Sequence, residues 1–208
     1  IAEGLKTSQQ VIVMTPASLR ANYIKELKKC GETLYKLNQY WEFIETRGKE
    51  DLEQSLSSIL NLSVDYIKQN KGAWLVDINK KSNIDKLSQD EMESLNSQIN
   101  MMIQHKYKFI NYNGLQKKDL YTSFGETEDK KGKKVNVFDN KVVIIDEAHN
   151  FVSRIVNKIK KPDSLSMVLY DKLKKAENAR IIFLTGTPII NYPNELGVLY
   201  NILRGNIK

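Results

Sequence analysis

Lys141-Val-Val-Ile-Ile-Asp-Glu-Ala-His149-Asn150 is the stretch of this chain that decides its fold. Its four β-branched residues form a short apolar run between polar residues, which is typical of a strand buried on both faces of a parallel sheet. Ligands of such sheets bind outside the carboxyl ends of the strands, where Asp146 and Glu147 follow. In nucleotide hydrolysis one carboxylate holds Mg²⁺ and a neighbouring one orients and deprotonates the attacking water. Alternatively, Asp146 caps the strand and Glu147 is a solvated residue at the start of a helix.

A second stretch, Ile181-Ile-Phe-Leu-Thr-Gly-Thr-Pro188, also runs from a buried strand into a tight turn. Together the two stretches resemble motifs II and III of the superfamily II helicases and translocases, whose Walker B box is spelled Asp-Glu-Ala-His. The resemblance implies an α/β fold, a RecA-like lobe with a mostly parallel central sheet flanked by helices, and ATP with Mg²⁺ as cofactors. It implies that Thr185, Gly186 and Thr187 lie at the nucleotide.

His149 completes the Asp-Glu-Ala-His box. The resemblance implies that it works with the turn after the second strand to report the state of the γ-phosphate to the nucleic-acid side. Alternatively, it is a buried histidine with satisfied hydrogen bonds.

Composition sets the broad class of the protein. The chain has 208 residues, 41% of them hydrophobic, which is enough for one large or two small domains. Its apolar runs are far shorter than the roughly 20 residues that a membrane span needs, so we expect no membrane partner. A formal net charge of +7 favours a polyanionic partner. The single cysteine, Cys30, excludes a disulfide framework and indicates a reducing, intracellular location.

No Gly-x-x-x-x-Gly-Lys-[Ser/Thr] loop occurs in the sequence, although hydrolysis of this kind needs a loop that cradles the phosphates. In the family that loop lies one helix upstream of the position of Ile1. We therefore interpret residues 1–208 as a partial ATP-binding domain without its Walker A segment, inactive by itself. The partner that the resemblance implies is a second RecA-like lobe of the same polypeptide.

Two further strand ends are candidates for contact with nucleic acid. Residues 10–14 form a predicted strand, and the helix that follows has an N-terminus suited to a phosphate group. This segment resembles motif Ia, and the end of a strand beginning at Tyr107 resembles motif Ib. The alternatives are a well-capped helix and ordinary polar groups at the end of a strand. The resemblance implies contact with the nucleic-acid backbone by Thr15, Pro16, Ser18, Arg20, Asn111, Tyr112 and Asn113.

Residues 38–104 lie where a minimal lobe has a much shorter connection, and we interpret them as a helix-rich insertion that serves packing or partner binding. Within and beside it the patterns predict a strand over 34–37, an aromatic helix over 39–44, a helix over 51–69 broken near Asn61, a strand over 73–78 and a helix that begins with a Ser88–Glu91 capping box.

The last third of the chain predicts a charged, mobile tip over 126–134 and a hairpin arm over 135–140. Helices follow over 150–160 and 164–175, then a strand over 180–184. The first of these helices is expected to turn Ile159 inward. The closing helix begins at Pro193, and its expected inner face consists of Leu196, Leu199, Tyr200 and Leu203.

Leu184-Thr-Gly-Thr-Pro-Ile, with Asn191 and Glu195 nearby, resembles the Swi/Snf-type branch, whose members are mostly translocases on double-stranded DNA. Looser strings, including Phe109-Ile-Asn-Tyr-Asn and Phe138-Asp-Asn, are similar to helicases of large cytoplasmic DNA viruses, such as the poxvirus nucleoside triphosphatase I and early transcription factor small subunit. This implies DNA rather than RNA as the nucleic acid, viral RNA polymerase or transcription factors as protein partners, and the host cytoplasm and virion as locations. A non-catalytic lobe that serves as a scaffold for protein interactions is the alternative.

Overall fold

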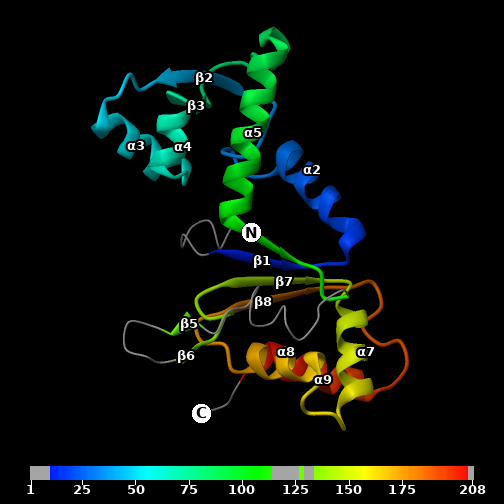
Figure 1. The fold of residues 1–208 in the computed structure, drawn as a ribbon. Helices are drawn as coiled ribbons and strands as arrows, with labels where there is room; N and C mark the ends of the chain where they lie inside the picture. The colour runs from blue at the N-terminus through cyan, green and yellow to red at the C-terminus, as the bar shows by residue number, and fades with distance from the viewer. Residues whose placement is uncertain (1–9, 114–126, 129–133, 206–208) are drawn as a thin grey trace. The chain divides into compact units, whose positions relative to one another are not determined.

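The structure is a computed structural model that describes residues 10–113, 127–128 and 134–205. The chain forms two compact units. The first, which we call the sheet unit, combines Ile1–Leu19 with Lys108–Lys208, and the second, the hairpin unit, is Arg20–Tyr107. Figure 1 shows the elements of both. The interpretation of 38–104 as an insertion stays a prediction.

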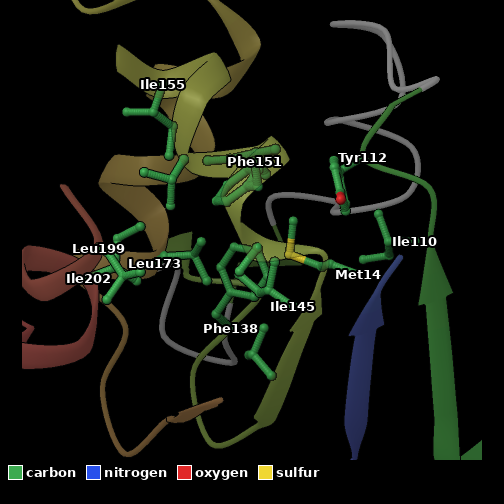
Figure 2. Packing of buried hydrophobic residues seen from close by; sticks show 14 of the residues in the cluster. Met14, Ile110, Tyr112, Phe138, Ile145, Phe151, Ile155, Leu173, Leu199 and Ile202 are labelled. Atoms are coloured by element: carbon green, nitrogen blue, oxygen red, sulfur yellow. The ribbon is translucent and has the colours of Figure 1, made fainter. Parts of the chain in front are cut away.

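The sheet unit is built on one four-stranded parallel sheet, which confirms the predicted α/β class. Its strands, in spatial order, are β4 (Tyr107–Ile110), β1 (Val11–Met14), β7 (Val142–Asp146) and β8 (Arg180–Leu184). β7 pairs in parallel with both β1 and β8, and Figure 2 shows β4 pointing the same way as β1. Met14 lies opposite Ile145, and Asp146 lies opposite Leu184. The carboxyl ends of the strands therefore share one edge of the sheet.

Burial along the strands follows their positions in the sheet. β1 and the apolar part of β7 are buried on both faces, as expected for central strands that helices cover. β8 alternates, with Arg180, Ile182 and Leu184 exposed. Among the described residues β8 pairs only with β7, so it is an edge strand.

Three helices of the sheet unit pack on a common core. They are α7 (Ala148–Lys158), α8 (Leu165–Lys174) and α9 (Asn194–Arg204). Figure 2 shows Phe151 and Ile155 of α7 together with Phe138, Leu173 and Ile202 in this core.

The predicted inner faces of two helices are partly wrong. In α9 the buried residues are Glu195, Val198, Leu199 and Ile202, whereas Tyr200 and Leu203 are exposed. The buried residues have the i, i+3, i+4, i+7 spacing of one helix face. This face is shifted by one position from the predicted face, because it includes a buried glutamate. Ile159 is likewise exposed, since it lies beyond the last residue of α7.

The hairpin unit combines a two-stranded antiparallel sheet with helices. Its elements are α2 (Arg20–Cys30), β2 (Tyr40–Glu45), α3 (Glu50–Leu60), α4 (Val64–Gln69), β3 (Gly72–Asp77), the 3₁₀ turn η2 (Ile84–Lys86) and α5 (Gln89–Lys106). The predicted break at Asn61 is confirmed, because this residue is left-handed at φ 53°. The Ser88–Glu91 capping box is also confirmed.

Two predictions in this region are wrong. Residues 39–44 form most of strand β2 instead of a helix, and 34–37 form no strand. β2 pairs antiparallel with β3, which sets Phe43 opposite Trp74 with their rings edge to face. This cross-strand pairing overrides the local pattern.

The predicted tip over 126–134 lies mostly outside the described residues. Its described ends form the short antiparallel pair β5 (Thr127–Glu128) and β6 (Lys134–Val135), so the predicted arm over 135–140 contributes only its first residue to a strand. Before β1 meets α2, Ala17–Leu19 form the 3₁₀ turn η1. None of the helices in the described ranges is long and apolar enough to cross a bilayer.

Candidate functional site

The turn from β7 into α7 presents the acidic pair. Asp146 is the last residue of β7, and its Oδ1 accepts the Glu147 backbone N–H at 3.0 Å. Glu147 is left-handed at φ 48° and ψ 47°, a conformation that costs a non-glycine residue about 1–2 kcal/mol. Both residues are half-exposed, and the Glu147 side chain is 44% exposed. The tight turn therefore leaves both carboxylates within reach of a ligand.

His149 joins this turn to the end of β8. Its Nδ1 lies 2.7 Å from Thr185 Oγ1, 3.4 Å from Thr187 Oγ1 and 3.4 Å from a carboxylate oxygen of Glu147. Thr185 Oγ1 also accepts the Thr187 backbone N–H at 3.1 Å. One ring nitrogen thus links Glu147 to the hydroxyls of the turn after β8. Residues from two neighbouring strands meet here, as the sequence predicts, although their catalytic roles stay a prediction.

Tyr112 contacts the backbone of the acidic turn through its hydroxyl, a role that the sequence did not indicate. Its hydroxyl lies 3.0 Å from the carbonyl oxygen of Asp146 and 3.1 Å from that of Glu147. Burial, followed by the negative charges of Asp146 and Glu147, raises the pKa of Tyr112 to about 12. The hydroxyl is therefore protonated near neutral pH and available as a donor.

The segment after the Thr185-Gly186-Thr187 turn is held in place by hydrogen bonds to Glu195. Its carboxylate accepts the backbone N–H of Ile190 at 2.7 Å and that of Asn191 at 3.2 Å. The Asn191 side chain donates to Ser153 Oγ on α7 at 2.9 Å. Ser153 follows His149 by one helical turn, so one face of α7 holds both ends of this segment.

The candidates for nucleic-acid contact divide by exposure. Ser18, Arg20 and Asn113 are exposed, and Pro16 and Asn111 are half-exposed, so contact through these five side chains stays a prediction. Arg20 begins the hairpin unit, whereas the other candidates belong to the sheet unit.

Thr15 and Tyr112 are corrections to the predicted contact set. Their side chains are only 1% and 3% exposed, which leaves no surface for a nucleic acid to touch. The Thr15 backbone N–H instead donates to Ile110 O at 3.0 Å and continues the sheet. The Tyr112 hydroxyl is hydrogen-bonded within the fold, whereas the buried Thr15 hydroxyl has no hydrogen-bond partner among the described residues.

The donor set at the acidic turn suits magnesium. Mg²⁺ typically takes one or two protein carboxylates and fills its other positions with water and substrate phosphates. Within the described ranges no three His, Cys, Asp or Glu side chains gather into a metal site. Asp146 fits the role of the single protein ligand, since only one of its oxygens is committed to the Glu147 N–H in this part of the chain.

The acidic turn lines neither of two cavities in the described part of the chain. One, of about 700 Å³, is in the hairpin unit beside Phe43 and Lys68. The other, of about 640 Å³, borders Arg180 at the amino end of β8.

Comparisons with known proteins agree with this arrangement. The profile of the SNF2-related domain matches residues 3–207. A protein named "Putative ATP-dependent RNA helicase" from Acanthamoeba polyphaga mimivirus is 26% identical over 208 residues, which cover 99% of this chain and 26% of that protein. A "Termination factor NPH-I homolog" of African swine fever virus is 39% identical over 66 residues, which cover 32% of this chain and 9% of that protein.

A second mimivirus protein, also named "Putative ATP-dependent RNA helicase", is 39% identical over 69 residues, or 31% of this chain and 8% of that protein. The aligned part therefore spans about a quarter of the first relative and about a tenth or less of the other two.

Proposed function

The chain belongs to the SNF2-related domain family, the Swi/Snf-like branch of the superfamily II helicases, and we propose that it is part of the ATP-binding lobe of a translocase that moves on nucleic acid. The observation that carries this proposal is the 2.7 Å contact between His149 and Thr185. It joins the acidic turn of β7 to the hydroxyl turn of β8 at the edge of the sheet where ligands of this fold class bind.

The residues divide the chemistry between them. Asp146 would hold the magnesium ion of bound ATP, and the ion would neutralise charge on the phosphates while water attacks the terminal phosphoryl group and ADP leaves. Glu147 accepts a proton from the attacking water and orients it, and its half-exposed carboxylate supports this role. Thr185 and Thr187 respond to the γ-phosphate, and His149 passes their change of hydrogen bonding to α7. Gly186 lets the turn approach the phosphate.

The phosphate-cradling loop and its lysine come from a strand that pairs with β8. Among the described residues β8 pairs on one side only, which supports this origin of the loop. A further parallel strand there would bring its carboxyl end to the same edge of the sheet as the acidic turn. A second RecA-like lobe of the same polypeptide completes the enzyme.

The nucleic acid binds across the carboxyl ends of β1 and β4, at Pro16, Ser18, Asn111 and Asn113 of the sheet unit. Arg20 of the hairpin unit stays a separate predicted contact. We further propose a viral protein of transcription, present in the host cytoplasm and the virion, with viral RNA polymerase or transcription factors as partners. The names of the African swine fever virus and mimivirus relatives support this. DNA remains our predicted substrate, although the mimivirus names specify RNA.

ATP turnover by the intact protein tests the proposal. Wild type is measured without nucleic acid and with single-stranded DNA, duplex DNA or RNA, beside Glu147→Gln and the exposed control Asp163→Asn. We expect duplex DNA to stimulate wild type and the control, and Glu147→Gln to lose about 100-fold or more in rate. Stimulation by RNA alone would correct the substrate. Absence of turnover by wild type with every nucleic acid would favour the scaffold alternative.

A further inference from the structure

Tyr112 lies between the proposed nucleic-acid surface and the acidic turn. It follows β4 by two positions, is 3% exposed, and packs edge to face on Phe151 of α7 with 5.7 Å between the ring centres. Figure 2 shows it beyond the carboxyl end of β1, beside Ile110 and Met14. Its ring is therefore held on one side by α7, whose first turn carries His149.

The hydroxyl of Tyr112 contacts the backbone of Glu147, the residue that we propose orients and deprotonates the attacking water. A hydroxyl has one proton, so the carbonyl oxygens of Asp146 and Glu147, 3.0 Å and 3.1 Å away, share it. Glu147 is one of the few described non-glycine residues with positive φ. A left-handed glutamate persists only where its surroundings hold it. The shared hydrogen bond is one such restraint, and the Glu147 N–H bond to Asp146 is another.

The residues on either side of Tyr112 face outward. Asn113 is exposed and Asn111 is half-exposed, and the Asn111 side chain accepts the Asn113 backbone N–H at 3.0 Å. The Tyr112 carbonyl oxygen accepts a hydrogen bond of 3.4 Å from Arg154 on α7. A ligand that displaces Asn111 or Asn113 therefore displaces a backbone that carries Tyr112 with it.

We propose that Tyr112 is a positioning residue that couples nucleic acid bound at Asn111 and Asn113 to the backbone conformation of Glu147. This inference rests on the proposed function. Nucleic acid at the surface fixes the 111–113 segment, the hydroxyl then holds the carbonyl groups of the acidic turn, and the Glu147 carboxylate keeps the direction that hydrolysis needs. Nucleic-acid stimulation of ATP turnover depends on this hydrogen bond.

The test uses Tyr112→Phe in the intact protein, which removes one oxygen atom and keeps the buried ring. Tyr170→Phe on α8 is the control, because Tyr170 is a half-buried tyrosine of the same unit. The quantity measured is the ratio of the ATPase rates with and without duplex DNA. We expect Tyr112→Phe to lower this ratio roughly fivefold, the rate equivalent of one ordinary hydrogen bond, and Tyr170→Phe to leave it unchanged.

Hydrogen exchange provides a second readout that needs no ATP. Duplex DNA should slow exchange of the backbone amides of residues 146–149 in wild type and in Tyr170→Phe, and Tyr112→Phe should lose this effect while binding the DNA with unchanged affinity. An unchanged stimulation ratio in Tyr112→Phe overturns the inference. So does wild-type protein that binds duplex DNA without slower exchange at 146–149, a result that stands even if the variant fails to fold. Wild type that binds no nucleic acid and turns over no ATP refutes the proposed function itself.

Discussion

Glu147 shows how a single residue combines chemistry with backbone strain. The sequence predicts an acidic pair at the end of a buried strand, and the structure places both residues there. The left-handed conformation of Glu147 was beyond prediction, because Glu has no intrinsic preference for positive φ. Two hydrogen bonds restrain it: a local one from its N–H to the preceding Asp146, and one from the distant Tyr112 hydroxyl to its carbonyl oxygen, which no local pattern encodes.

The contact between His149 and Thr185 yields a prediction about coupling. In the intact protein, His149→Ala and Thr185→Ala should each lower the stimulated ATPase rate, and a double-mutant cycle should give an interaction energy of about 0.5–3 kcal/mol because the two side chains touch. Thr187→Ala is the matched control, since its hydroxyl lies 3.4 Å from the same nitrogen instead of 2.7 Å. A cycle with His149 and Thr187 should give the smaller energy. Equal energies for both threonines would contradict this reading of the site.

Polar residues at strand ends mark the limit of prediction at this scale. Thr15 and Tyr112 belong to segments that the sequence predicts to contact nucleic acid, yet both residues are buried. The side chain of a threonine or tyrosine can be exposed on a surface or buried beneath it. Which of the two occurs depends on which face of the segment packs inward. Neighbouring polar residues such as Asn113 carry the exposed face.

Two helix starts allow a matched test of capping. Ser88 caps α5, with its hydroxyl accepting the Glu91 backbone N–H at 3.3 Å, whereas Ser164 precedes α8 and makes no side-chain cap hydrogen bond. Ser88→Ala should therefore lower the free energy of unfolding by about 1 kcal/mol, and Ser164→Ala should cost clearly less. Urea unfolding of both variants measures the difference. A larger loss for Ser164→Ala would contradict the capping geometry.

The hydrogen bonds of Glu195 in α9 lead us to predict that the free energy of unfolding depends on pH. Burial raises the pKa of its carboxyl group, but hydrogen bonds from the Ile190 and Asn191 backbones and from side chains outweigh burial and leave the pKa below its ordinary value of 4.5. A lowered folded-state pKa contributes stability above the unfolded pKa, and this contribution is lost as the pH falls through the folded value.

Glu195→Gln should accordingly lower the free energy of unfolding by about 1–3 kcal/mol at pH 7, because hydrogen bonds to a charged group are lost. The difference from wild type should shrink as the pH falls below 4.5. Chemical unfolding at a series of pH values measures both quantities, with the exposed Glu50→Gln as control. A difference that stays constant down to pH 3 would exclude the charged hydrogen bonds as its cause.

Among the elements, helices with a sustained pattern of apolar residues and clear end signals were predicted best. The end of α3 and the start of α5 follow from Asn61 and Ser88, whose backbone or side-chain hydrogen bonds are local. β2 was missed because a short run of aromatic residues fits a helix and a strand equally well. Its pairing with β3, some 30 positions later in the chain, decides the matter.

At the scale of the whole molecule, we predict that the 208 residues alone do not hydrolyse ATP although they contain part of the site. The 208-residue chain has the acidic turn and the hydroxyl turn, but its sequence contains no phosphate-cradling loop with a lysine. We therefore expect this chain alone to show no nucleic-acid-stimulated ATP hydrolysis, while the intact protein shows it. Phosphate release by the two proteins side by side is the measurement. Robust turnover by the 208 residues alone would mean that these residues bind the triphosphate in a way we have not identified.

At this scale the fold class was predictable and the division into units was less so. Buried strands that alternate with helices specify a parallel sheet, and all four strands of that sheet were foreseen. The hairpin unit covers Arg20–Tyr107, and the interpretation of 38–104 as an insertion stays a prediction. Compactness depends on contacts between distant segments, such as Lys28 with Asn96, which composition along the chain does not reveal.

The central claim is that the carboxyl ends of β7 and β8 form one site for ATP hydrolysis, and a single-turnover experiment tests it most directly. Intact wild-type protein, Glu147→Gln and the control Asp163→Asn are loaded with Mg²⁺ and ATP, and bound ATP and released phosphate are measured together. We predict equal ATP binding by all three and a rate of phosphate release at least about 100-fold lower for Glu147→Gln alone. A Glu147→Gln rate within about twofold of wild type, at equal ATP binding, would contradict the claim.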